Sequence, residues 1–159
     1  MRESDPVLKS RLVSLENSKY EHGVEMIPNN DLENTLGNRA LISDRAKQGQ
    51  PDGSTIHYDP ARQTSNRGEP SSARGQLAHE LLGHSYDADK GTLDTGSISD
   101  STGNSIRKFE VRAVIVENIF RQRESEPQRT TYNGLPIPPE LLNRRYLTQK
   151  IPNAKINNR

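Results

Sequence analysis

Two histidines and a glutamate lie within six residues, in the string HELLGH at residues 79–84. Neutral imidazole nitrogens bind zinc, and a carboxylate beside the metal can serve as the general base that activates a water molecule. The apolar and small residues around the string favour a helix. These residue types predict the zinc site of a hydrolase, with His79 and His84 as ligands and Glu80 as the base.

The spacing of the two histidines constrains the backbone between them. In the common helical motif H-E-x-x-H the histidines are four residues apart and share one face. His79 and His84 are five apart, and at about 100° per residue a regular α-helix would turn their rings roughly 140° apart. We therefore expect a bulge or an unwound turn near Leu82 and Gly83.

Two resemblances extend this interpretation. The string HELLGH resembles the zinc motif of the dipeptidyl peptidase III family, in which a downstream helix with the pattern E-x-R-A supplies a third ligand; residues 110–113 have this pattern. The chain is far shorter than that enzyme, so we interpret the likeness as a shared design of the site. Residues 54–146 also resemble small bacterial effector and toxin metallopeptidases of the zincin type, including NleD-like type III effectors. Those relatives usually carry H-E-x-x-H, one residue shorter.

The third ligand is less clearly marked than the two histidines. A catalytic zinc needs three protein ligands and one open position, and both resemblances imply Glu110. Asp94 is the alternative, because a Gly-Thr-x-Asp string supplies the third ligand in aspzincin-type peptidases. Asp87, Asp89 and Glu117 could instead hold a histidine ring by its other nitrogen.

Other polar residues could contact the substrate. We expect Arg112 to bind a substrate carboxylate or to stabilise an oxyanion. Tyr86 or Tyr132 could donate a hydrogen bond to the tetrahedral intermediate. His57 is interpreted as structural, and His22 as an incidental turn residue.

The remaining pattern predicts an α+β fold, a minimal zincin-like metallopeptidase domain at residues 1–147. A small, mostly antiparallel sheet would pack on the zinc-motif helix and on a second long helix. The predicted helices are 6–19, 72–84, 105–123 and 140–146, and the predicted strands are 23–27, 39–43 and 54–58. Residues 44–53, 61–71 and 85–104 are predicted as turns or loops. Residues 148–159 are expected to form a polar, flexible tail.

Composition narrows the function further. Of 159 residues only 30% are hydrophobic, no cysteine is present, and 22 basic residues balance 21 acidic ones. The chain therefore has no thiolate zinc site, and its charge favours neither nucleic acid nor an anionic membrane as partner. The N-terminus lacks the apolar core of a signal peptide. We expect a protein that is secreted or delivered without a cleavable signal, or a C-terminal domain of a larger protein.

The resulting hypothesis is a Zn²⁺ endopeptidase, and the resemblance implies a bacterial effector or toxin with a cognate immunity protein or chaperone. Its protein or peptide substrate would bind as an extended strand, at a sheet edge made by residues 54–58. Two alternatives stay open: a metal-dependent hydrolase of another amide, and a domain that binds a metal or a partner without catalysis.

Overall fold

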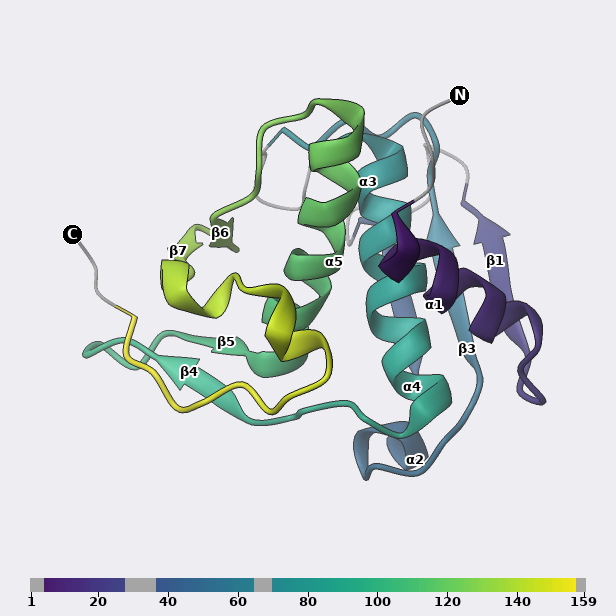
Figure 1. Cartoon of the computed structure of the whole chain (residues 1–159), viewed down its shortest axis with the longest axis horizontal. Helices are drawn as coiled ribbons and strands as arrows, with labels where there is room; N and C mark the ends of the chain where they lie inside the picture. The colour runs from purple at the N-terminus through teal and green to yellow at the C-terminus, as the bar shows by residue number, and fades with distance from the viewer. Residues whose placement is uncertain (1–4, 28–36, 65–69, 157–159) are drawn as a thin grey trace.

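The structure is a computed structural model that describes residues 5–27, 37–64 and 70–156. Parts of the predicted loop 61–71 and of the predicted tail therefore lie outside the described residues. The fold is α+β, as predicted: two long helical segments lie side by side, with a sheet on one side and short hairpins on the other (Figure 1).

The zinc-motif helix is three segments joined end to end. α3 (Ala73–Leu77) continues into a π-helix, η2 (Ala78–Ser85), and then into α4 (Tyr86–Lys90). Its N-terminus is capped by Ser72, whose Oγ accepts a hydrogen bond from the Gly75 N–H at 3.0 Å. The helix passes the predicted end at residue 84 and stops at Gly91, whose φ of 62° favours glycine.

The second long helix, α5 (Lys108–Glu124), packs along the motif helix and is the most deeply buried element. Residues 111–119 are all buried, because α5 faces η2 on one side and an apolar core on the other. This core is built by the following residues: Ile98, Ile106, Val111, Val114, Ile115, Ile137, Leu141, Tyr146, Ile151 and Ile156.

A three-stranded sheet covers the other side of the motif helix. Its strands β1 (His22–Met26), β2 (Arg39–Ile42) and β3 (Ser54–Tyr58) are arranged in the order β1-β3-β2. β1 pairs parallel and β2 antiparallel with β3, whereas the other two ladders of the described residues are antiparallel. β3 is thus the central strand. The expectation that residues 54–58 form a free sheet edge is wrong, because both of its sides are paired.

Short elements complete the fold. α1 (Pro6–Glu16) packs on α4, α5 and η2. α2 (Asp44–Lys47) replaces the first part of a predicted turn, and its N-terminus is capped by Ser43. β4 (Ser97–Ser99) pairs with β5 (Ser105–Arg107), and β6 (Thr131–Tyr132) with β7 (Leu135–Pro136). The helix predicted at 140–146 is two 3₁₀ turns, η3 (Pro139–Leu141) and η4 (Arg144–Leu147).

Residues 148–156 pack against the domain, where the sequence predicts a flexible tail. Ile151 and Ile156 are buried in the core next to α5, and the Ile156 N–H donates to the Ser99 carbonyl at 3.0 Å. Two apolar side chains among polar neighbours were enough to anchor the segment. Within the described residues, no helix is both long and apolar enough to cross a membrane.

Gly83 sets the distance between the two long helices. A Cβ at this position would lie 2.7 Å from the Ala113 Cβ and 2.9 Å from the Ala113 Cα. Real Cβ atoms do not approach this closely, so only glycine permits the observed contact between η2 and α5.

We expect Gly83→Ala to lower the free energy of unfolding by about 1–3 kcal/mol, the usual cost of overpacking. Gly23→Ala is the matched control, because its Cβ would meet only the Thr55 Oγ1 at 3.9 Å. Urea unfolding of both variants gives the comparison. Combining Gly83→Ala with Ala113→Gly should recover part of the loss, and equal stability of the two single variants would contradict the packing argument.

Candidate metal centre

The π-helix brings the two histidines of the motif together. In this geometry hydrogen bonds close between residues five apart, so His79 and His84 lie one turn apart on the same face. Their ring centroids are 4.8 Å apart, with the rings nearly perpendicular. The irregular backbone predicted near Leu82 and Gly83 is thereby confirmed, and it extends over the whole segment from Ala78 to Ser85.

A buried arginine from another element supports the π-helix. Arg11 of α1 donates a hydrogen bond to the Leu82 carbonyl at 2.7 Å, and its guanidinium lies 4.2 Å from the centroid of the Tyr86 ring. The same side chain lies 3.8 Å from the Asp87 carboxylate. Arg11 thus bonds a main-chain carbonyl at the wide turn and packs on the α-helical turn that follows it.

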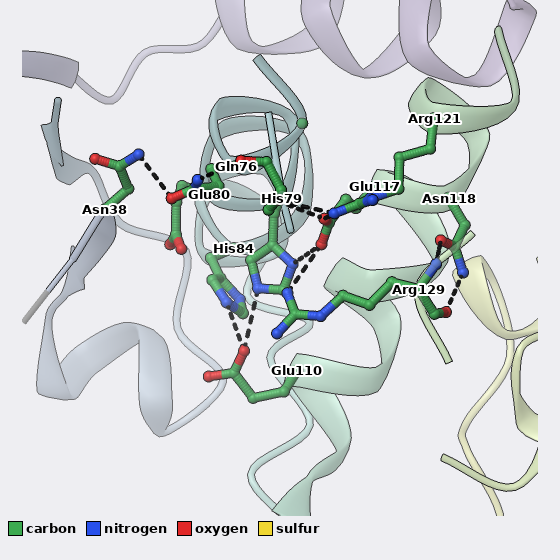
Figure 2. A network of polar contacts seen from close by, with 12 residues as sticks. Asn38, Gln76, His79, Glu80, His84, Glu110, Glu117, Asn118, Arg121 and Arg129 are labelled. Carbon is green, nitrogen blue, oxygen red and sulfur yellow. Dashed lines mark hydrogen bonds and ion pairs between the residues drawn. The ribbon is translucent and has the colours of Figure 1, made fainter. Parts of the chain in front are cut away.

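Glu110 completes a three-donor cluster with the two histidines. Its carboxylate Oε2 lies 3.2 Å from the His79 Nε2 and 3.0 Å from the His84 Nε2 (Figure 2). Tetrahedral zinc ligands at 2.0–2.2 Å from the metal are roughly 3.3–3.6 Å from one another. Two imidazoles and one carboxylate with converging donor atoms are therefore close to the arrangement that holds such an ion.

Glu80 also lies beside the histidines but makes a different contact. One donor atom each from His79, Glu80 and His84 lies within 4.8 Å of the others, a group that could hold a metal ion. The Glu80 Oε2, however, accepts a hydrogen bond from the main-chain N–H of Ala40 at 2.7 Å. The Glu80 carboxylate is thus anchored to strand β2, whereas the Glu110 carboxylate contacts both imidazoles.

Burial and charge give the two carboxylates opposite properties. Burial raises the pKa of the Glu80 carboxyl, and His84 and His79 offset this only in part. For Glu110, burial also favours the neutral acid, but the contacts with His84 and His79 outweigh it and lower the pKa. The contacts of Glu110 therefore favour its carboxylate form, whereas the proton affinity of Glu80 is raised.

Contacts with carboxylates raise the pKa values of both imidazoles. Burial alone would lower the pKa of His79, but hydrogen bonds to Glu110 and Glu117 raise it to about 10. The pKa of His84 is also raised, because the charge and hydrogen bond of Glu110 outweigh its burial. A metal ion binds neutral imidazole, so binding at this cluster must release protons.

Glu117 holds His79 by its second nitrogen. The His79 Nδ1 lies 3.1 Å from the Glu117 Oε2, and Glu117 is fully buried (Figure 2). Arg121 and Arg129 each bond the same carboxylate, at 2.8 Å and 3.1 Å. The sequence offered Glu117 as a residue that could hold a histidine ring by its other nitrogen, and its contact with the His79 Nδ1 has this geometry.

Tyr132 and Phe109 are aromatic residues of this centre, and the Phe109 ring lies edge-on to the His84 imidazole with centroids 5.3 Å apart. The Tyr132 ring stacks on the His79 imidazole, with centroids 6.2 Å apart and planes 8° from parallel, and its hydroxyl is hydrogen-bonded to the Glu110 carboxylate. Burial, with the nearby Glu110 charge, raises the pKa of the Tyr132 hydroxyl. The group therefore keeps its proton and acts as a donor.

The structure does not bring Arg112 and Tyr86 to the histidines. Arg112 is buried and bonds the Asp87 carboxylate, the Thr92 carbonyl and the Tyr146 carbonyl at 2.8–3.1 Å. Together with Tyr86 it lines a separate cavity of about 530 Å³. Its role is to join α5 to the loop after α4, because its fixed donors are used by these three acceptors.

Asp94, the alternative third ligand, and Asp87 and Asp89, two candidate partners of the histidine rings, contact other groups. Asp94 lines the cavity of Arg112, and its Oδ1 accepts from the Gly96 N–H at 3.1 Å. Asp87 bonds Arg112, and Asp89 lies 3.2 Å from His22, which also contacts the Ser54 hydroxyl at 2.9 Å. His22 therefore links the sheet to α4, and is more than an incidental turn residue.

Two clefts lead away from the centre, and both are lined by Asn38, Glu80 and Tyr132. The smaller one, of about 50 Å³, also reaches Gln76 and Arg129. The larger one, of about 390 Å³, runs along Asn38 and strand β2 past His84 and Glu110. Sequence reasoning missed Arg129 and the main-chain donor of Ala40. For Arg129 no local motif gives a signal, although Asn133-Gly134 marks a hairpin turn beside it.

The comparisons with known proteins give a family. The model of the Peptidase M91 family, described as effector protein, matches residues 7–136. The match includes HELLGH, Glu110, Glu117 and Tyr132. No curated protein and no solved structure matches the chain.

We expect Glu117 to contribute to the loss of stability of the folded protein at acid pH. Burial raises its pKa, but the hydrogen bond from His79 and the charges of Arg129 and Arg121 more than offset this and lower it to about 2. A depressed pKa contributes stability that is present above the unfolded value near 4.5 and is lost as pH falls toward 2. In the metal-free protein we therefore expect Glu117→Gln to be much less stable than wild type at pH 7, with a gap that narrows between pH 4.5 and 2.

Urea unfolding at a series of pH values, after dialysis against a chelator, measures this gap. Glu124→Gln, at an exposed position of the same helix, should show a small difference from wild type that does not change with pH. A gap for Glu117→Gln that is constant from pH 7 to 2 would contradict the assignment.

Proposed function

We propose that this chain, which belongs to the Peptidase M91 family of effector proteins, is a zinc-dependent endopeptidase that cleaves a peptide bond within a protein. The observation that carries the proposal is the π-helix. It places His79 and His84 on one face, next to the carboxylate of Glu110, with Glu80 beside them. A backbone form this rare is expected where a function requires it.

The donor set favours zinc. Two imidazole nitrogens and one carboxylate oxygen form a common catalytic zinc site, in which three protein ligands leave one position open. Hard cations such as Mg²⁺ and Ca²⁺ prefer oxygen ligands only. His79, His84 and Glu110 would hold the ion, and Glu117 would fix the tautomer and orientation of His79.

The catalytic residues then follow from their positions. When bound, zinc supplies Lewis-acid polarisation of the scissile carbonyl and a more acidic water. Glu80 accepts a proton from the attacking water, which its raised pKa allows. The same carboxyl then returns the proton to the leaving amine. Its hydrogen bond to the Ala40 N–H, at 2.7 Å, keeps the group aimed between the cluster and β2.

The substrate is proposed to bind as an extended segment along β2. Within the described residues this strand lies at the edge of the sheet, because it pairs with β3 on one side only. Residues 38–42 line the same cleft as Glu80, His84 and Glu110. A strand added there would form main-chain hydrogen bonds with β2 and would carry its carbonyl past the metal cluster. This edge takes the place of the edge that the sequence placed at residues 54–58.

Family membership suggests where the enzyme acts. An effector peptidase is expected to be delivered into a target cell and to cleave a protein there. We infer that a chaperone or immunity protein holds the enzyme inactive in the producing cell. The chain could equally be one domain of a larger secreted protein.

The first expected outcome is one zinc ion per chain. Elemental analysis after extensive dialysis should find about one equivalent in wild type, and much less in His84→Ala and Glu110→Ala, because each variant removes a ligand. His57→Ala is the matched control, since His57 lies on β3 and pairs with Glu25 at 3.4 Å. Equal zinc in wild type and His84→Ala would remove His84 from the site.

The second expected outcome separates binding from catalysis. Glu80→Gln should keep zinc and the thermal unfolding midpoint but lose nearly all turnover, because the amide cannot accept the proton. Digestion of a denatured-protein mixture, read by mass spectrometry of the new termini, measures turnover. Glu16→Gln, on the exposed side of α1, should retain wild-type activity. Loss of zinc in Glu80→Gln with zinc retained in Glu110→Gln would mean that the two roles are exchanged.

A further inference from the structure

Tyr132 occupies a position that the proposed function has not yet used. The residue ends β6, and its ring lies flat against the His79 imidazole. Its hydroxyl bonds Glu110, and its side chain lines both clefts that leave the metal cluster. Tyr132 contacts two of the proposed ligands, His79 and Glu110, and lines both clefts. Its side chain therefore lies beside any peptide bond placed over the cluster.

The hairpin β6–β7 holds Tyr132 in a fixed orientation. Its turn residues Asn133 and Gly134 have φ of 50° and 78°, the positive values of the tight hairpin turn that Asn-Gly favours. The strand that returns leads to Ile137, which is buried in the core and donates its N–H to the Thr130 carbonyl at 2.8 Å. The hairpin is therefore anchored on the same core as α5.

Arg129 also contacts the Tyr132 ring. Its guanidinium lies 5.1 Å from the ring centroid, donates to the Thr131 carbonyl at 3.0 Å and to Glu117 at 3.1 Å. The main chain of Arg129 is joined to Asn118 of α5 by two hydrogen bonds, of 2.7 Å and 2.8 Å (Figure 2). Glu117 thus orients both His79 and, through Arg129, the ring that stacks on His79.

Asn38, Gln76 and Lys47, which also line the two clefts, have acceptors of their own. Asn38 donates to the Gln76 Oε1 at 2.9 Å, and Gln76 to the Ser71 carbonyl at 2.9 Å. Lys47 pairs with Asp44 at 3.1 Å. The Tyr132 hydroxyl, by contrast, donates to Glu110, and a carboxylate that binds a metal has less electron density to offer another donor. This hydroxyl is thus the donor most readily released toward a substrate.

We propose that Tyr132 is a catalytic residue, whose hydroxyl moves from Glu110 to the carbonyl oxygen of the scissile bond, with Arg129 as its positioning residue. The inference rests on the proposed peptidase function. The hydroxyl donates a hydrogen bond to the negative charge that develops on the carbonyl oxygen, and it keeps its proton throughout. The proton of the attacking water goes to Glu80 and then to the leaving amine, so the two residues have separate tasks.

Tyr132→Phe tests this role directly, because it keeps the ring stacked on His79 and removes only the hydroxyl. We expect unchanged zinc content, an unchanged KM for an internally quenched peptide that wild type cleaves, and a kcat lower by about 10²–10³-fold, the usual effect of losing one oxyanion donor. Tyr20→Phe, in the loop before β1, is the matched control and should retain wild-type kinetics.

A binding measurement gives a readout that does not depend on turnover. N-phosphoryl-leucyl-tryptophan presents a tetrahedral anion, and calorimetry on the zinc-loaded protein should show that it binds Tyr132→Phe much more weakly than wild type. The uncleaved peptide, measured in the Glu80→Gln background, should bind equally with Tyr132 and with Tyr132→Phe. Equal affinity of both forms for the phosphoramidate would overturn the proposal.

Arg129 is tested by a double-mutant cycle. Arg129→Gln should lower kcat without loss of zinc, and should cause little further loss in the Tyr132→Phe background, because its effect passes through the tyrosine. Independent, additive effects would assign Arg129 a purely structural role. Full activity of Tyr132→Phe in the presence of an active wild type would overturn the role of Tyr132 alone, whereas a zinc-loaded wild type that cleaves no peptide would overturn the peptidase function first.

Discussion

The extra residue between the two histidines is the constraint on which the rest of the structure depends. A regular α-helix would direct the two rings to different faces, and the π-helix removes this conflict by placing residues five apart on one turn. The wide turn requires support from outside the helix. Arg11 bonds the Leu82 carbonyl. Gly83 allows α5 to pack against η2 more closely than any residue with a Cβ atom would permit. That approach places Glu110 3.0–3.2 Å from both imidazoles.

Charge explains why these ionisable groups can lie together inside a small domain. Buried carboxylates and imidazoles are costly unless they are paired. Here Glu117 is fully buried but contacts His79, Arg121 and Arg129, while Glu110 contacts both histidines. These contacts hold the donor atoms of Glu110 and the two imidazoles close together, and they lower the pKa values of Glu110 and Glu117 while raising those of His79 and His84. The Glu80 carboxyl differs from those of Glu110 and Glu117, because it accepts a hydrogen bond from the Ala40 N–H of strand β2.

Local patterns predicted the elements that chemistry and periodicity mark. The motif helix, the strand 54–58 and the irregular turn before His84 follow from residue types and spacing alone. The tertiary arrangement of these elements could not be predicted from local patterns. Whether residues 54–58 lie at an edge or in the centre depends on which strands pair with them, and the distance between Arg112 and the histidines depends on how α5 is rotated. An E-x-R-A pattern gives the same letters whether its arginine faces a substrate or, as here, the buried Asp87.

The same limit explains why the hairpin residues were harder to identify than the helix residues. His79, Glu80 and His84 are close in sequence, so their spacing carries geometric information. Tyr132 reaches His79 only because the β6–β7 hairpin returns to α5, where Asn118 and Glu117 hold the neighbouring Arg129. The carboxylate that orients a proposed metal ligand therefore also orients the aromatic ring stacked upon it. A substitution of Glu117 should therefore alter the orientation of both His79 and, through Arg129, Tyr132. In this way α5 links the proposed metal site to the geometry of the cleft.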